Sequence, residues 1–127
     1  METQIIPKYF EHYYNLSDVR RHCNKSIDEI LETRKETFYV GITHDLPNLM
    51  NKWPYKAQVK NLYLLCITDK YHSANTYGNE LINKYGNHDL NYMKVTKGKP
   101  QTFNQMCEDF GNIYKGINPW YVFMLSD

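Results

Sequence analysis

Charge imbalance, long apolar runs and a leader-like N-terminus are all missing from this 127-residue sequence. Fifteen basic residues stand against fourteen acidic ones, so no global positive field is present to drive salt-sensitive binding of phosphates. Any contact with nucleic acid must therefore be local. No apolar run approaches the roughly 20 residues of a membrane span, and no basic-then-apolar segment resembles a signal peptide. We expect an intracellular protein, cytoplasmic or nuclear, with no membrane partner.

Cysteine and histidine are too scattered to indicate a disulfide framework or a zinc site. The three cysteines, Cys23, Cys66 and Cys107, are widely spaced and form no CxxC motif. An odd number of dispersed cysteines fits a reducing compartment better than a secreted protein. The five histidines include no pair at the four-residue spacing that would place two ligands on one helix face.

The chain also lacks internal repeats, low-complexity tracts and a Pro/Gly/Ser linker, so its length predicts a single domain. A hydrophobic share of 42% with 15% aromatic residues indicates a folded core. Twelve tyrosines are the most unusual feature of the composition. They are suited to stacking on single-stranded nucleic acid or to anchoring a protein interface, and composition does not separate the two.

Helical patterns occupy four stretches. The segment from Leu16, "LSDVRRHCNKSIDEILETRKE", predicts one helix or two abutting ones, with Ser17 capping a turn and Ser26 and Glu29 at capping-box spacing. A short helix is expected after Asp45, as its cap, and before Pro54. Another begins at a Ser73 cap and stops at Gly86, and a short one lies around 103–110. The 73–86 helix presents one apolar face formed by Ala74, Tyr77, Leu81, Ile82 and Tyr85.

Three strands are predicted. Residues 37–43, "TFYVGIT", are β-branched and aromatic, and residues 120–125, "WYVFML", close the chain as a strand. Residues 60–69, "KNLYLLCITD", read as a strand covered on both faces. Residues 1–16 show no clear period and fit either an edge strand or a short helix. Short connections between these elements favour a small α/β or α+β layer sandwich.

Residues 37–90 contain, in order, a strand ending in Tyr39, Val40 and Gly41, the stretch "ITHDL", a short helix, an apolar strand and a helix with "LINKYGN". This order of elements resembles the core of the GIY-YIG endonuclease family. The resemblance implies an α/β (α+β) fold with a small three-stranded, mostly antiparallel sheet flanked by helices. It implies one domain, 1–127, with an N-terminal helical extension of about 1–36. The family's first strand is missing upstream, and "WYVFML" is similar to it. A circular permutation would place this tail strand beside residues 37–43.

The same resemblance implies metal-dependent hydrolysis of a phosphodiester in DNA or RNA, with Mg²⁺ or Mn²⁺. Such a reaction needs a base for water, a cation for the phosphate and a metal for the leaving group. Tyr39 or Tyr121 would be the base-side tyrosine, with His44 close enough to assist. Lys52 would be the phosphate cation, and Glu80 the candidate metal ligand.

Two departures from the family pattern leave the enzyme assignment open. No arginine follows Arg34, and Gly78 occupies the position where many members carry the metal-binding glutamate. The alternative is a catalytically inactive module that binds nucleic acid or a protein partner. The lysines around the Gly-Lys-Pro turn are candidate contacts for a nucleic-acid backbone: Lys94, Lys97 and Lys99.

Overall fold

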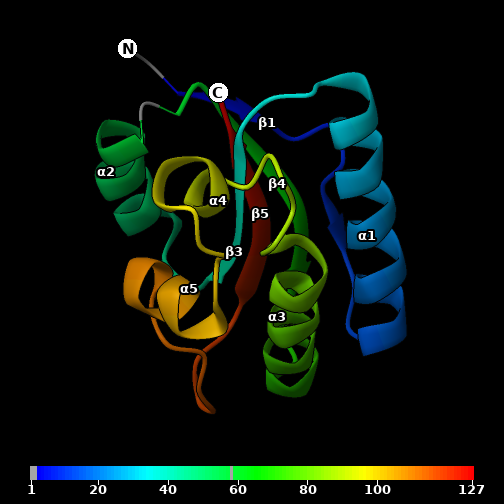
Figure 1. The fold of residues 1–127 in the computed structure, drawn as a ribbon. Helices are drawn as coiled ribbons and strands as arrows, with labels where there is room; N and C mark the ends of the chain where they lie inside the picture. The colour runs from blue at the N-terminus through cyan, green and yellow to red at the C-terminus, as the bar shows by residue number, and fades with distance from the viewer. Residues whose placement is uncertain (1–2, 58) are drawn as a thin grey trace.

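The computed structural model describes residues 3–57 and 59–127, with the backbone only for 54–57. The described chain forms an open mixed sheet with helices packed on it (Figure 1). The elements in chain order are β1 (Gln4–Ile6), β2 (Glu11–His12), α1 (Leu16–Thr33), β3 (Phe38–Thr43), α2 (Leu46–Ala57), β4 (Asn61–Thr68), α3 (Tyr71–Tyr85), α4 (Tyr92–Lys97), α5 (Phe103–Phe110) and β5 (Trp120–Ser126).

The sheet has five strands, where the sequence predicted three. Its main order is β1-β4-β5-β3, and the two-residue β2 also pairs with β4. The three predicted strands are present and form the antiparallel part, because β5 runs antiparallel to both β3 and β4. The two additional strands are parallel to β4 and come from the N-terminal segment that shows no sequence period.

The tail strand lies directly beside residues 38–43, as predicted. Thr43 pairs with Tyr121 and Tyr39 pairs with Leu125. β5 also pairs with β4 along its other edge, so the last strand of the chain is a central strand of the sheet. Its burial supports this position, since six of its seven residues are buried.

Helices pack on both faces of the sheet. α1 and α3 pack side by side on one face, where a side chain at Gly78 would meet Ile42. α2 and α5 lie on the other face, where Trp53 and Phe110 contact the ring of Tyr39. Because successive strand residues point to opposite faces, Tyr39 and Ile42 of β3 face these two different layers. α1 contributes buried apolar residues to the same core as the strands (Val19, Cys23, Ile27 and Ile30).

The outer edge of β3 is closed by amide groups instead of another strand. The Phe38 N–H donates to the Leu90 carbonyl at 3.0 Å. Further along, Gln101 Nε2 donates to the Val40 carbonyl at 2.6 Å, and Asn91 Nδ2 donates to Gln101 Oε1 at 2.9 Å. Both amide side chains are almost fully buried, so they satisfy edge groups that water does not reach.

The predicted helices are found, with differences at their ends. The apolar face of α3 is confirmed, since all five predicted residues are buried and the helix ends at Tyr85 before Gly86. Ser73 does not cap α3: the helix starts at Tyr71, and Ser73 Oγ donates to the Tyr14 carbonyl. Ser26 is not a cap either. It lies inside the single helix α1, where the i−4 carbonyl of His22 satisfies its hydroxyl.

Two further helix boundaries differ from the prediction. Asp45 accepts from the Asn48 N–H as the expected cap of α2, but the helix continues past Pro54 to Ala57. The segment with Lys94 and Lys97, for which no helix was predicted, forms α4. Asn91 caps α4 through the Met93 N–H, and Gly98 ends it with a φ of 69°, a conformation that favours glycine.

Candidate functional site

Tyr39 is a core residue with 1% of its surface exposed. Its ring packs on Trp53 with centroids 4.5 Å apart, and its hydroxyl donates to Asp109 Oδ2 at 2.6 Å. Burial, followed by the contact with the Asp109 carboxylate, raises the pKa of Tyr39 well above that of a free phenol. A phenol held in this way keeps its proton and is shielded from a phosphate in solution.

Tyr121 lies at the other end of the same strand pair. It is half-buried, and its ring stacks on Phe10 with centroids 6.5 Å apart and planes inclined by 15°. Tyr39 and Tyr121 point to the same face, because Tyr121 pairs with Thr43 and residues 39 and 43 share a face. Four residues of strand separate them by about 13 Å. The two tyrosines therefore do not share a cleft.

The space between the two tyrosines is filled. Gly41 lies midway along β3, and a Cβ placed there would be 2.6 Å from the Phe110 ring and 2.7 Å from Phe123. The Phe110 and Phe123 rings meet edge to face at a centroid distance of 4.8 Å. The glycine is required for close ring packing on this face, which explains the Tyr-Val-Gly sequence without a bound phosphate.

Glu80 lies on the opposite layer from Tyr39. It projects from α3 and forms a bidentate ion pair with Arg20 of α1. Arg20 Nε donates to Glu80 Oε1 at 2.5 Å, and Arg20 Nη2 donates to Glu80 Oε2 at 2.7 Å. The hydrogen bond from Arg20 lowers the pKa of Glu80. Both Glu80 carboxylate oxygens are engaged in joining the two helices, and the sheet separates them from Tyr39.

Gly78, which the resemblance would align with a metal-binding glutamate, is buried. A Cβ there would lie 3.2 Å from Phe103, 3.3 Å from Ile113 and 3.4 Å from Ile42. A carboxylate built onto this position would enter an apolar layer and lose its hydration. Within the described residues, no three His, Cys, Asp or Glu side chains gather as a metal site would need.

The Glu80–Arg20 pair predicts an acid-dependent loss of stability. Because the pKa of Glu80 is lowered in the folded state, the pair contributes fully above the ordinary glutamate pKa of about 4.3 and is lost as the pH falls through the lowered pKa. We expect the melting temperature of Glu80→Gln to fall less steeply below this pH than that of the parent. Glu32→Gln, which changes an exposed carboxylate on α1, should keep the parent slope. Identical slopes for parent and Glu80→Gln would contradict the assignment.

His44 and Lys52 lie at different ends of the β3–β5 pair. The His44 ring meets Trp120 edge to face at 5.3 Å, next to Tyr121, and its Nδ1 is buried with no hydrogen-bond partner among the described residues. Lys52 is exposed on α2, adjacent to Trp53, whose ring packs on Tyr39. His44 therefore lies near Tyr121, whereas Lys52 lies at the end of β3 that carries Tyr39.

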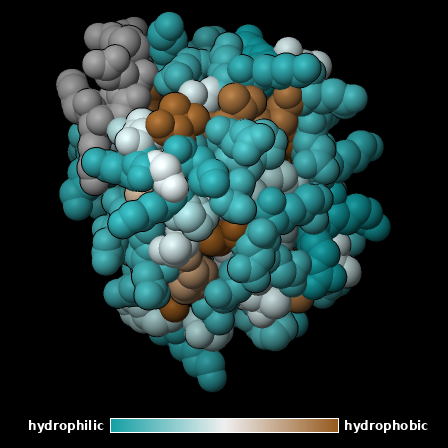
Figure 2. All heavy atoms as spheres, viewed as in Figure 1, coloured by the Kyte–Doolittle hydropathy of each residue, from teal (hydrophilic) through white to brown (hydrophobic). Residues whose placement is uncertain are grey.

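The three candidate nucleic-acid lysines gather on α4 and the turn after it. Lys94 and Lys97 belong to the last turn of the helix, and Lys99 follows Gly98. None of the three forms an ion pair with a described residue. Figure 2 shows that the side of the molecule carrying α3, α4 and α5 is mainly hydrophilic, with small separate apolar patches.

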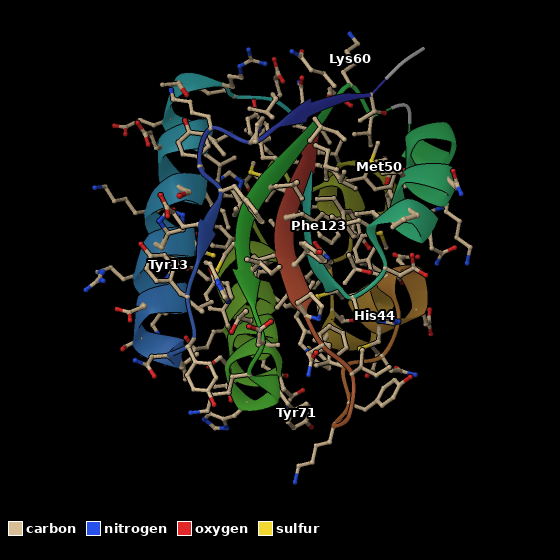
Figure 3. The ribbon with its side chains drawn as sticks, turned by 180° about the vertical axis from the view of Figure 1, so that it is seen from behind. Tyr13, His44, Met50, Lys60, Tyr71 and Phe123 are labelled. Atoms are coloured by element: carbon tan, nitrogen blue, oxygen red, sulfur yellow. The ribbon has the colours of Figure 1, made fainter. Side chains whose placement is uncertain are left out.

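On the reverse side, no helix is drawn over β4 and the adjacent part of β5 (Figure 3). The expectation that β4 is covered on both faces is wrong at Leu64 and Ile67, which are half-buried. They share this face with exposed Ile5, because Ile5 pairs with Leu62 and Ile67 pairs with Tyr121. We define the open strip as Ile5, Phe10, Leu64, Ile67 and Tyr121.

Sequence reasoning missed the open strip because two of its members lie in the aperiodic N-terminal segment. The uninterrupted apolar run of β4 also resembles a strand buried on both faces, so Leu64 and Ile67 carried no distinguishing signal. The tyrosine content was the only indication, and Tyr121 is the tyrosine that reaches this strip.

Comparisons with known proteins leave the family open: no family model, no curated protein and no solved structure matches this chain. The helices formed by residues 3–57 and 59–127 include none with both the length and the apolarity that crossing a membrane requires.

Proposed function

We propose that the protein is a binding module that engages a protein partner through the open strip. The observation that carries the proposal is an apolar sheet surface without a helix over it, formed by Ile5, Phe10, Leu64, Ile67 and Tyr121. Contiguous apolar surface of this kind is a common mark of an interface. Its two aromatic rings, Phe10 and Tyr121, are already stacked, so little side-chain entropy is lost on docking.

A protein partner fits the strip better than nucleic acid does. The strip itself is apolar, whereas binding of nucleic acid requires cations beside the stacking rings. The three clustered lysines belong to α4 and the turn after it, and α4 packs on β3, the edge strand at the opposite end of the sheet from β1. The stacked rings lie before β2 and on β5, so the rings and the clustered lysines belong to different elements.

The geometry also favours binding over hydrolysis. Tyr39 is buried, and its hydroxyl proton is donated to Asp109. Tyr121 is about 13 Å away from Tyr39 along the strands. Glu80 is paired with Arg20 on the other face of the sheet. Metal-dependent hydrolysis with Mg²⁺ or Mn²⁺ stays a prediction from the family resemblance, and a nuclease assay of the parent and Tyr39→Phe tests it.

The binding proposal predicts that polar substitutions in the strip abolish capture of a specific protein. The purified parent, the double variant Ile5→Asp/Tyr121→Arg and the control Val95→Asp/Tyr114→Arg would each be immobilised and exposed to extract from the source organism. Val95 and Tyr114 are 54% and 50% exposed, against 50% for Ile5, and both doubles leave the net charge unchanged. We expect one protein to be retained by the parent and the control and depleted about tenfold by the strip variant.

Two further conditions make the capture result decisive. Treating the extract with nuclease beforehand should leave the captured protein unchanged, whereas loss of the signal would favour nucleic acid instead. Ile5→Asp alone, at the most exposed position of the strip, replaces the double variant if the double no longer melts cooperatively. Equal capture by strip and control variants would contradict the proposal.

A further inference from the structure

A hollow of about 290 Å³ lies between the N-terminal strand region and the end of α1. Its floor is formed by Ile6, Tyr9, Ile30 and Tyr63, and Lys8 and Arg34 stand among its lining residues. β1 and the last turn of α1 meet near the top of Figure 1. Tyr63 and Leu64 are consecutive strand residues and point to opposite faces, so the hollow is separate from the open strip.

The floor of the hollow is apolar and deep. Ile30 and Tyr63 are 2% and 4% exposed, and the rings of Tyr9 and Tyr63 approach with centroids 6.4 Å apart. The Tyr63 hydroxyl makes no hydrogen bond with any described residue, and it is not among the fully buried polar atoms, so the 4% of this residue that is exposed leaves the hydroxyl accessible. An accessible hydroxyl without a protein partner is an available donor for a group bound in the hollow.

The lining carries more positive than negative charge. Lys8 and Arg34 are exposed and form no ion pair with a described residue, while Glu29 is the one acidic residue of the lining. The C-terminal end of a helix, where free carbonyl oxygens carry partial negative charge, normally repels an anion. Here the Ile30 carbonyl already accepts from the Arg34 N–H at 2.7 Å, and the Glu29 carbonyl accepts from the Thr33 hydroxyl at 2.9 Å. These bonds satisfy two carbonyls near the end of α1, and the positive charge of Arg34 at the C-cap opposes the field of the remaining ones.

We infer that this hollow is a binding site for a small amphipathic anion, with an alkyl or aryl body on the Ile30–Tyr63 floor and its charged head between Lys8 and Arg34. The volume is at the lower end of the range of small-molecule sites, which begins at about 300 Å³, so the ligand is small. An apolar floor with a few convergent polar groups is the usual composition of such sites. The inference is independent of the open strip and of any protein partner.

The experiment uses two probes with alkyl chains of similar length and opposite head charges, octanoate and octyltrimethylammonium, each titrated into the full-length protein. Amide chemical shifts report the site, and we expect octanoate to move the signals of Ile30, Thr33 and Arg34 first. Octanoate should bind at least about tenfold more tightly than the cationic probe. Equal affinity of the two probes, or no shift at the end of α1, would overturn the inference.

Charge variants provide the matched controls. Lys8→Glu/Arg34→Glu should weaken octanoate binding about tenfold, whereas Lys94→Glu/Lys97→Glu, with the same change in net charge on α4, should leave it unchanged. Glu29→Gln should tighten binding, because it removes the only negative charge of the lining. Equal weakening by both double variants would show a general charge effect and reject the site. Since all five substituted positions are at the surface or half-buried, these variants are expected to stay folded.

Discussion

Replacing Gly41 by alanine is expected to lower the free energy of unfolding by about 2–3 kcal/mol. The new Cβ would lie 2.6 Å from two atoms of the Phe110 ring and 2.7 Å from Phe123. Neither ring can move away into solvent, since Phe110 is 3% exposed and Phe123 is fully buried. The rings must move apart or β3 must shift, and either response disturbs the packing around Tyr39. Chemical denaturation of parent and variant measures the loss.

Gly78→Ala is the matched control for Gly41→Ala. Its Cβ would approach only side-chain atoms, at 3.2–3.4 Å, and alanine is the better residue inside a helix by up to about 1 kcal/mol. We therefore expect a net change within about 1 kcal/mol of the parent. Equal losses at the two glycines would mean that the close ring packing on β3 is not what requires Gly41.

Gln101→Leu is expected to cost about 3 kcal/mol, because it removes the buried donor to the Val40 carbonyl and one of the two acceptors of Asn91 Nδ2. The Val40 carbonyl would lose its 2.6 Å bond and Asn91 Nδ2 would lose its acceptor in Gln101. Leucine has nearly the same size, so the loss reports the hydrogen bonds and not a cavity. Hydrogen exchange of the β3 amides should accelerate together with the fall in stability.

Asn79→Leu is the control for the edge substitution. Asn79 is exposed on α3, and its amide bonds only to the Asn75 carbonyl of the same helix. This change should stay within about 0.5 kcal/mol of the parent. A similarly small effect of Gln101→Leu would show that the edge of β3 does not depend on the buried amides.

The sequence was most informative where periodicity was strong. The α3 face from Ala74 to Tyr85 and the strands 38–43, 61–68 and 120–126 follow from spacing and from β-branched and aromatic content. β1 and β2 did not, because strands of three and two residues are too short to show alternation. α4 was also missed: it is six residues long, and no residue in it is buried.

The arrangement of the candidate groups depended on tertiary facts that one sequence does not reveal. Pairing of the tail strand with residues 38–43 was predictable, but its register was not: Tyr39 lies opposite Leu125, and Tyr121 lies opposite Thr43. Asp109, which binds the Tyr39 hydroxyl, is 70 residues away and carried no motif. Arg20 likewise showed no sign of pairing with Glu80 across α1 and α3.

Cleavage of DNA and RNA by the parent and Tyr39→Phe, with Mg²⁺ or Mn²⁺ and with both metals chelated, tests most directly whether Tyr39 is a structural residue. A structural role of Tyr39 predicts no metal-dependent cleavage by the parent and a loss of about 1–2 kcal/mol of stability in Tyr39→Phe, because Asp109 loses its tyrosine donor. Metal-dependent cleavage by the parent that disappears in a folded Tyr39→Phe variant would contradict it.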